Sequence, residues 1–188
     1  MKRPWGWLAG LVSTDARARR EVARLLYAAV GARAREPVFY TRFQVPDSVD
    51  GRFDMIALHA FLVLRRLKEE GADGAALGQA LFDAIFTDMD RSLREMGAGD
   101  LGVGRRVKRM ARGFYGRIAA YDQALAPGGD LDDALRRNLY GTVDPDSRTV
   151  ANFAAYTREV AESLATQPRE RLFAGVLDFA APPAGEDP

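Results

Sequence analysis

The sequence has 188 residues, a length that fits one domain with a sizeable hydrophobic core. It is 47% hydrophobic and 28% charged, which is typical of a globular protein and excludes a disordered chain. A formal net charge of +1 excludes nucleic-acid binding driven by overall charge, and the absence of cysteine excludes disulfides, thiol nucleophiles and thiolate metal sites. A sequence without cysteine gives no sign of an oxidising compartment, so we expect a cytoplasmic protein.

Residues 1–12 are predicted to be an N-terminal arm. Its apolar patch, from Trp5 to Val12, is too short to cross a bilayer, which takes about 20 apolar residues. No small-residue cleavage site follows, so the arm does not read as a secretory signal. Two tryptophans beside Lys2 and Arg3 suit a membrane interface, and packing of the arm on the body is the alternative.

A helical domain is expected from residue 13 to residue 178, with its first helix capped by Ser13 or Thr14. Along this helix apolar residues recur at helical spacing, and arginines occupy the other side. The next segment, residues 38–53, contains proline and glycine that break any long element. Its aromatic residues indicate a loop that packs on the body: Phe39, Tyr40 and Phe43.

The most apolar helix is expected from about residue 50 to residue 70 and contains "FDMIALHAFLVLRRLK". It is apolar on nearly all sides between Met55 and Leu64, which predicts a place in the middle of a bundle. The exception is His59, the only histidine in the sequence. One histidine without cysteine argues against a metal site, and a Ser-His-Asp triad would need this side chain exposed. We expect a hydrogen-bonded core or cleft-edge imidazole, with a backbone carbonyl or a carboxylate such as Asp88 as its partner.

The rest of the chain also reads as helical. Helices are expected at about 75–96, 103–125, 131–141 and 145–166, with a last turn or two after Pro168. Residues 179–188 are predicted to be a disordered tail. No alternating apolar run is long enough to predict a sheet. The predicted fold class is therefore all-α, a single-domain bundle of about six or seven helices around a nearly fully buried helix.

The helix at 103–125 carries the strongest local charge asymmetry. Between Leu101 and Arg117 there is no acidic residue, and the basic ones are Arg105, Arg106, Lys108, Arg109, Arg112 and Arg117. One interpretation is a solvated face paired with the acidic residues of "LDDAL" and "FTDMD". The others are an anionic surface of lipid headgroups or RNA phosphates, and a protein partner with acidic loops. Nucleic acid is the weakest of these, because no stacking platform or recognition helix is evident.

Several stretches in combination resemble the ubiquinol–cytochrome c chaperone family. The matching elements are Val45-Pro46-Asp47, the helix entry from Asp50 through Gly51 to Phe53, the pair Leu58-His59, the segment Asp88-Met89-Asp90 and the region from Gly102 to Tyr115. The resemblance covers about residues 36–126. It marks Pro46, Asp47, Asp50, Gly51, Phe53, His59 and Asp88 as structural or family-motif positions.

This resemblance implies a helical, non-enzymatic chaperone for assembly of the cytochrome bc1 complex, with no cofactor or metal. The implied client is newly made cytochrome b or a related membrane protein, and further partners are an anionic membrane surface and a partner subunit. A bacterial member would act in the cytoplasm, peripheral to the inner membrane. An apolar groove with a charged rim would hold the client or the membrane, and its expected residues are Phe39, Tyr40, Phe43, Arg105, Lys108, Arg109 and Arg112.

The alternative function is an all-α enzyme or binding protein for an isoprenoid or lipid-like ligand. Its cleft would be lined by His59, Asp88 and the aromatic residues of the segment 38–53. Isoprenoid synthases bind magnesium through repeated D-D-x-x-D motifs, and "TDMD" and "LDDAL" are too sparse for that pattern. We therefore expect no catalytic residues.

Overall fold

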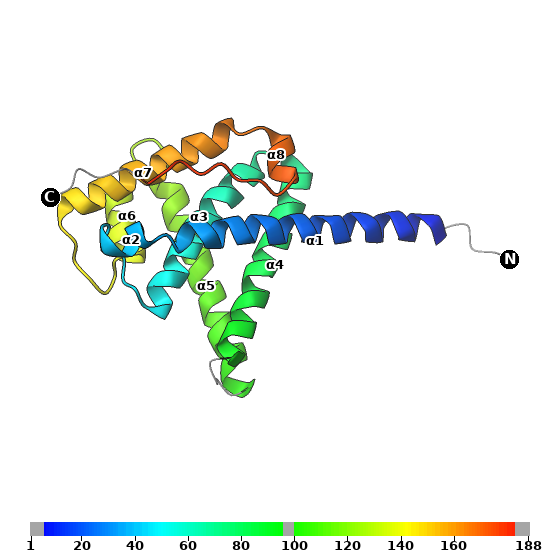
Figure 1. Cartoon of the computed structure of the whole chain (residues 1–188), viewed down its shortest axis with the longest axis horizontal. Helices are drawn as coiled ribbons and strands as arrows, with labels where there is room; N and C mark the ends of the chain where they lie inside the picture. The colour runs from blue at the N-terminus through cyan, green and yellow to red at the C-terminus, as the bar shows by residue number, and fades with distance from the viewer. Residues whose placement is uncertain (1–5, 96–99, 183–188) are drawn as a thin grey trace.

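The computed structural model describes the backbone of residues 6–95 and 100–182 and the side chains of residues 15–95 and 102–182. All regular structure in these ranges is helical (Figure 1), which confirms the all-α fold class. The helices are α1 (Gly6–Ala34), α2 (Pro37–Thr41), α3 (Val49–Lys68), α4 (Gly71–Glu95), α5 (Asp100–Ala124), α6 (Leu131–Asn138), α7 (Ser147–Thr166) and α8 (Arg169–Phe173). Only α2 and α8 are as short as 5 residues, and α2 replaces part of the expected loop.

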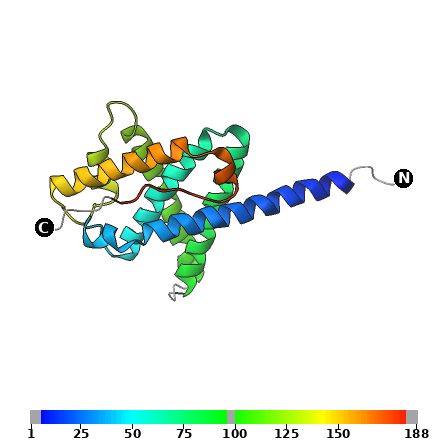
Figure 2. The same ribbon diagram turned by 45° about the horizontal axis from the view of Figure 1, so that its top comes forward.

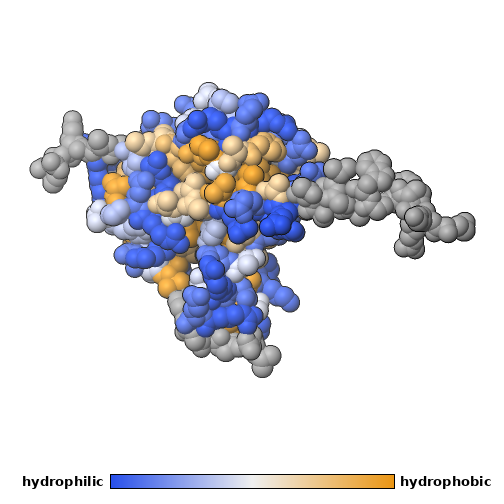
Figure 3. All heavy atoms as spheres, turned by 45° about the vertical axis from the view of Figure 1, so that its right-hand side comes forward, coloured by the Kyte–Doolittle hydropathy of each residue, from blue (hydrophilic) through white to orange (hydrophobic). Residues whose placement is uncertain are grey.

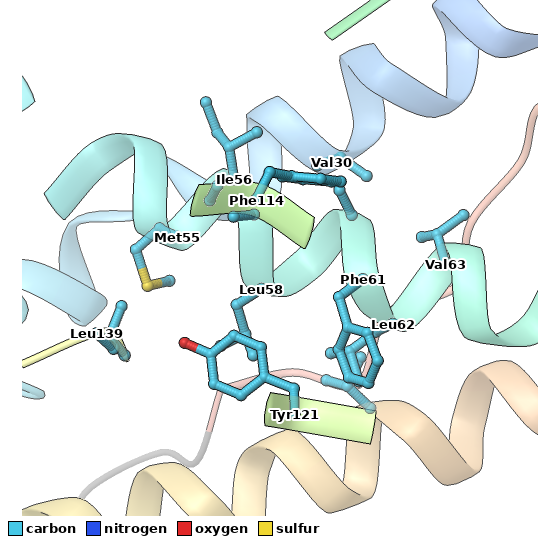
Figure 4. Close-up of a cluster of buried hydrophobic side chains, with 14 of the residues drawn as sticks. Val30, Met55, Ile56, Leu58, Phe61, Leu62, Val63, Phe114, Tyr121 and Leu139 are labelled. Carbon is cyan, nitrogen blue, oxygen red and sulfur yellow. The ribbon is translucent and has the colours of Figure 1, made fainter. Parts of the chain in front are cut away.

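Helix α3 lies at the centre of the bundle. It packs against α1, α4, α5 and α7, and its buried residues run from Gly51 to Leu67 around the whole helix. Figure 4 shows Leu58, Phe61 and Leu62 of α3 beside Tyr121 of α5, with ring centroids of Phe61 and Tyr121 5.7 Å apart. Each fully buried leucine or phenylalanine contributes about 1.5–3 kcal/mol to folding, so this helix supplies much of the stability of the domain.

The entry into α3 explains most of the motif around residues 46–53. Ser48 caps the helix, with its hydroxyl accepting from the amide of Gly51 at 3.1 Å. A β-carbon on Gly51 would lie 2.0 Å from the carbonyl oxygen of Pro46, so only glycine allows the preceding chain to approach this closely. Asp47 accepts from Arg52 at 2.6 Å, and exposed Asp50 lies in the first turn. Phe53 is buried beneath.

Helix α4 begins earlier than its expected start near residue 75. Only two residues separate Lys68 from Gly71, whose φ of 64° reverses the chain in a conformation that glycine adopts readily. Gly74 is buried inside the new helix, where a β-carbon would lie 1.9 Å from the carbonyl oxygen of Leu67. The glycines of "GADG" therefore permit close packing of α3 and α4 as well as the turn between them.

Helix α1 begins at Gly6, before the caps expected at Ser13 or Thr14, so part of the predicted arm is helical. Residues 1–5, and with them Trp5, lie outside the described residues, and so does the side chain of Trp7. The placement of these tryptophans at a membrane interface thus stays a prediction. Figures 1 and 2 show the N-terminal part of α1 projecting from the body, and among its side chains described from residue 15 onward the first buried one is Ala23.

Residues 176–182, here called the C-terminal segment, run extended between α7 and α1 in both ribbon views (Figures 1 and 2). The Gln167 side chain holds the segment, donating to the carbonyl of Val176 at 2.7 Å and accepting from the amide of Asp178 at 2.9 Å. Phe179 packs on the core, and its carbonyl accepts from Arg33 at 3.1 Å. The prediction of disorder from residue 179 is therefore wrong for the start of the tail. Residues 183–188 lie outside the described residues.

We expect Gly51→Ala to lower the free energy of unfolding by about 2–3 kcal/mol, because the added methyl group overlaps the Pro46 carbonyl. Gly116→Ala is the matched control, since a β-carbon there meets nothing within 4 Å. In the exposed interior of α5 this control should stabilise the protein by about 0.5–1 kcal/mol. Urea unfolding followed by circular dichroism measures both. A Gly51→Ala protein as stable as the wild type would contradict the steric explanation.

Candidate functional site

His59 is fully buried in α3 and serves the core. Its Nδ1 lies 2.9 Å from the carbonyl oxygen of Met55, and its Nε2 lies 2.9 Å from the hydroxyl of Tyr156. A carbonyl can only accept, so Nδ1 carries the proton, and Nε2 accepts from the tyrosine. Burial lowers the pKa of His59 from 6.5 to about 4, so the ring is neutral at pH 7. The expectation of a hydrogen-bonded imidazole is correct, and Met55 supplies the predicted backbone carbonyl.

An aromatic cage surrounds the imidazole. Phe39 and Phe179 lie with ring centroids 5.5 and 5.6 Å from it, and the Phe179 ring is nearly perpendicular to the imidazole, at 87°. Tyr156 and Phe153 continue the cluster from α7. These side chains come from α2, α3, α7 and the C-terminal segment, so the imidazole ties four parts of the chain together.

Asp88 does not meet His59, which corrects the partner that the sequence suggested. The Asp88 carboxylate accepts from the hydroxyl of Tyr27 at 2.7 Å and forms an ion pair with Arg91. It lines a groove between α1 and α4, and His59 is not part of that lining. The cleft containing both residues, on which the alternative ligand-binding function depended, is therefore not formed.

Two of the three aromatic residues expected to contact a client lie in the core. The side chains of Phe39 and Phe43 are 0% and 2% exposed, because α2 turns them inward against Phe153. Tyr40 is half-buried and donates its hydroxyl to the carbonyl of Ala34 at 2.6 Å. The prediction that Phe39 and Phe43 form an exposed apolar groove is wrong.

Other apolar side chains reach the surface. Figure 3 shows hydrophobic residues gathered across the middle of one face of the body, bordered by hydrophilic residues above and below. Leu25 of α1 and Val176 of the C-terminal segment are 46% and 40% exposed. The two elements approach closely, since a β-carbon on Gly175 would lie 2.6 Å from the β-carbon of Leu25. We call the exposed pair Leu25 and Val176 the apolar junction. It can offer an apolar contact that the 38–53 segment does not.

All the basic residues of α5 except Arg117 are exposed and form no ion pair with any described residue. We define the basic face by Arg105, Lys108, Arg109 and Arg112, which lie on one side of the helix. Of the four aspartates in the acidic segments, three pair elsewhere (Asp88 with Arg91, Asp90 with Arg94 and Asp133 with Arg137), and Asp132 forms no ion pair with the basic face. The interpretation of a face neutralised by those acidic segments is thus wrong, and an anionic partner remains a prediction.

Arg117, the sixth basic residue of this stretch, has a different role. Its guanidinium lies 2.7 Å from the carboxylate of Asp54 at the α3–α5 contact and 5.9 Å from the ring centroid of Phe53. Burial raises the pKa of Asp54 to about 7, although Arg117 opposes the shift. This pair is structural, because it lies between packed helices.

The groove between α1 and α4, here called the α1–α4 groove, has a volume of about 830 Å³ and was not anticipated from the sequence. Its arginines are Arg19, Arg20, Arg24, Arg35 and Arg91, and its alanines are Ala16, Ala28, Ala76, Ala80 and Ala84. Sequence reasoning placed the arginines of the first helix on the side opposite its apolar residues and assigned them no site. The available signal was the fourfold spacing of alanines at 76, 80 and 84, which leaves one face of α4 without large side chains.

None of the helices in the described ranges is long and apolar enough to cross a bilayer. Within the same ranges, no group of three or more histidine, aspartate or glutamate side chains is placed to hold a metal ion. The surfaces available for function are thus the exposed apolar junction, the basic face and the α1–α4 groove.

Comparison with known proteins shows the family of the chain. It belongs to the ubiquinol–cytochrome c chaperone family, whose model matches residues 41–179. A crystal structure described as the Cbp3 homolog from Brucella abortus superposes with a TM-score of 0.79 at 37% sequence identity, covering 93% of this chain and 97% of that one.

Curated relatives are named ubiquinol–cytochrome c reductase complex assembly factor 1. The mouse protein is 27% identical over 135 residues, and this chain spans 46% of its length. The Xenopus laevis protein is 26% identical over 135 residues, with 68% of its length covered. The Drosophila melanogaster protein is 25% identical over 165 residues, with 64% covered.

We expect His59→Gln to weaken the pH dependence of stability. The folded-state pKa of about 4 lies below the unfolded 6.5, so the unfolded state gains the proton first and wild-type stability falls as the pH drops through this window. Over the full window this amounts to about 3 kcal/mol. Asp54 acts in the opposite sense between pH 3.8 and about 7, so the variant must be compared with the wild type at each pH.

The measurement is the free energy of unfolding from urea titrations between pH 7 and pH 4. The variant should be less stable at pH 7, and the gap should narrow as the pH falls. Thr157→Val is the control, because this buried hydroxyl does not titrate and its loss should shift stability equally at every pH. A gap that stays constant for His59→Gln would overturn the description of a buried neutral imidazole.

Proposed function

We propose that this chain is an assembly factor for the cytochrome bc1 complex and binds newly made cytochrome b, or another membrane-protein component, before incorporation. The observation that carries the proposal is the family membership over residues 41–179, supported by likeness along nearly the whole chain to the Cbp3 homolog. The activity is binding, so it requires surfaces that a hydrophobic client can use and no reacting side chain.

Two surfaces serve this function. The exposed Leu25 and Val176 offer apolar contact for a membrane-protein segment, while the basic face of α5 attracts anionic headgroups. Each basic residue near an anionic membrane contributes about 1 kcal/mol of attraction. A protein held in this way would work at the cytoplasmic surface of the inner membrane, where its client is inserted.

Deletion of the gene in its source cell should lower both assembled bc1 complex and cytochrome b. Unheld cytochrome b exposes apolar surface and is open to proteolysis, so both should fall together. Native gel electrophoresis measures the complex, and reduced-minus-oxidised haem spectra measure cytochrome b. Expression of the wild-type chain should restore both. Normal levels of complex and cytochrome b in the deletion strain would remove the assignment.

We expect the double variant Arg105→Glu/Arg109→Glu to bind anionic vesicles at least tenfold more weakly than the wild type, because two attractive charges become repulsive. Cosedimentation with vesicles of phosphatidylglycerol and phosphatidylcholine at two salt concentrations measures the loss. The matched control is Lys68→Glu/Arg148→Glu, which reverses two exposed charges on α3 and α7. Equal losses for both pairs would show that net charge acts and the basic face does not.

A further inference from the structure

The α1–α4 groove has the dimensions of a helix-binding site. Its lining runs along α1 from Ala16 to Arg35, the residue just past the end of the helix, and along α4 from Ala76 to Arg91. At 1.5 Å per residue, these stretches are roughly 22–28 Å long, which matches about four or five turns of a helix. The groove is partly open to solvent, so an occupant can enter it from outside.

The floor of the groove admits close approach. Ala76, Ala80 and Ala84 follow one another at fourfold spacing on α4, and each is only partly buried by the rest of the protein. Rows of residues four apart form the ridges and grooves through which helices pack. Because alanine side chains are small, the backbone of a third helix can come close to α4 there.

The rim of the groove selects for negative charge. Five arginines face two aspartates in the lining, and both aspartates are already engaged. Asp83 accepts from Gln79 at 2.8 Å, while Asp88 is held by Tyr27 and Arg91. Arg19, Arg20 and Arg35 form no ion pair with any described residue. The Arg24–Glu21 pair is exposed on both sides and contributes little.

The arrangement of these charges favours a linear partner over a single headgroup. The arginines on the α1 side of the groove are spread from Arg19 to Arg35, just past the end of the helix, over about 24 Å. A phosphate would meet only one or two of them, while acidic side chains repeated along a helix would meet all. In addition, no side chain of α1 between Asp15 and Val22 is fully buried, and only Ala16 and Val22 are partly buried. A helical stretch with so little burial is marginal, so a partner lying along it would stabilise it.

We propose that the α1–α4 groove binds an amphipathic helix of a protein partner that presents small apolar residues to α4 and acidic residues to the arginines of α1. This is the helix-in-groove mode of recognition, in which apolar residues at intervals of three and four supply the contact and charge fixes the orientation. The inference rests on the groove alone and holds whether or not cytochrome b is the client of the apolar junction.

The test is site-specific photo-crosslinking of the full chain in its source cell. Gln79→p-benzoylphenylalanine places the probe on the exposed lining of the groove, and Val143→p-benzoylphenylalanine, on an exposed residue outside it, is the control. Mass spectrometry of the crosslinked peptide identifies the occupant. A partner segment of helical periodicity with acidic residues, captured from Gln79 and not from Val143, is the expected result.

The double variant Arg20→Glu/Arg24→Glu should reduce this crosslink at least tenfold, while Lys68→Glu/Arg148→Glu should leave it unchanged. All four residues are exposed, so the fold should be retained, and circular dichroism with thermal melting checks this. Reversing the charges of the captured acidic segment should restore the crosslink to the Arg20→Glu/Arg24→Glu protein. A phospholipid adduct, a second copy of this chain, a segment without acidic residues or no crosslink at Gln79 would each overturn the proposal.

Discussion

The fold depends on burying one helix on every side while satisfying the single imidazole that it carries. α3 packs against four other helices, so the His59 ring at its centre has no route to water. An unpaired ring nitrogen in that position would cost about 1–3 kcal/mol, and a charged ring would cost far more. Met55 and Tyr156 remove the penalty from opposite sides, and burial keeps the ring neutral. The imidazole therefore fixes the spacing of α3 and α7, and it has no free nitrogen for chemistry.

Most of the helices can be predicted from the sequence, because they follow from local rules. Apolar periodicity places α3 and α5. Ser48 and Asp146 cap α3 and α7 close to the starts expected at about residues 50 and 145. The predictions that were wrong concern contacts and connections between helices. Asp88 has Tyr27 as its partner, 61 residues away, and a two-residue link joins α3 to α4 where a longer break was expected. Such partners are chosen by the crossing of helices, which periodicity along one helix does not determine.

The candidate functional surfaces also differ in how far the sequence alone predicts them. Charge clustering on α5 is visible in the sequence because its basic residues recur along one face of a single helix. Whether those charges are neutralised depends on where the acidic segments fold, and here they pair with their own helices. Phe39 and Phe43 could not be placed from the sequence, because an apolar side chain in a predicted loop can belong to a client-binding surface or to the core. In the structure both are buried. The α1–α4 groove required both helices to be placed side by side, which no single stretch of sequence specifies.

The position of Phe179 has a consequence for the order in which the molecule can be completed during synthesis. Its ring closes the cage around the α3 imidazole, and its carbonyl receives the guanidinium of Arg33 from α1. Helices made earlier are thus sealed by a residue that is made after all of them. A growing chain can form its early helices on the way, yet its interior stays open to solvent on that side until translation has passed this phenylalanine.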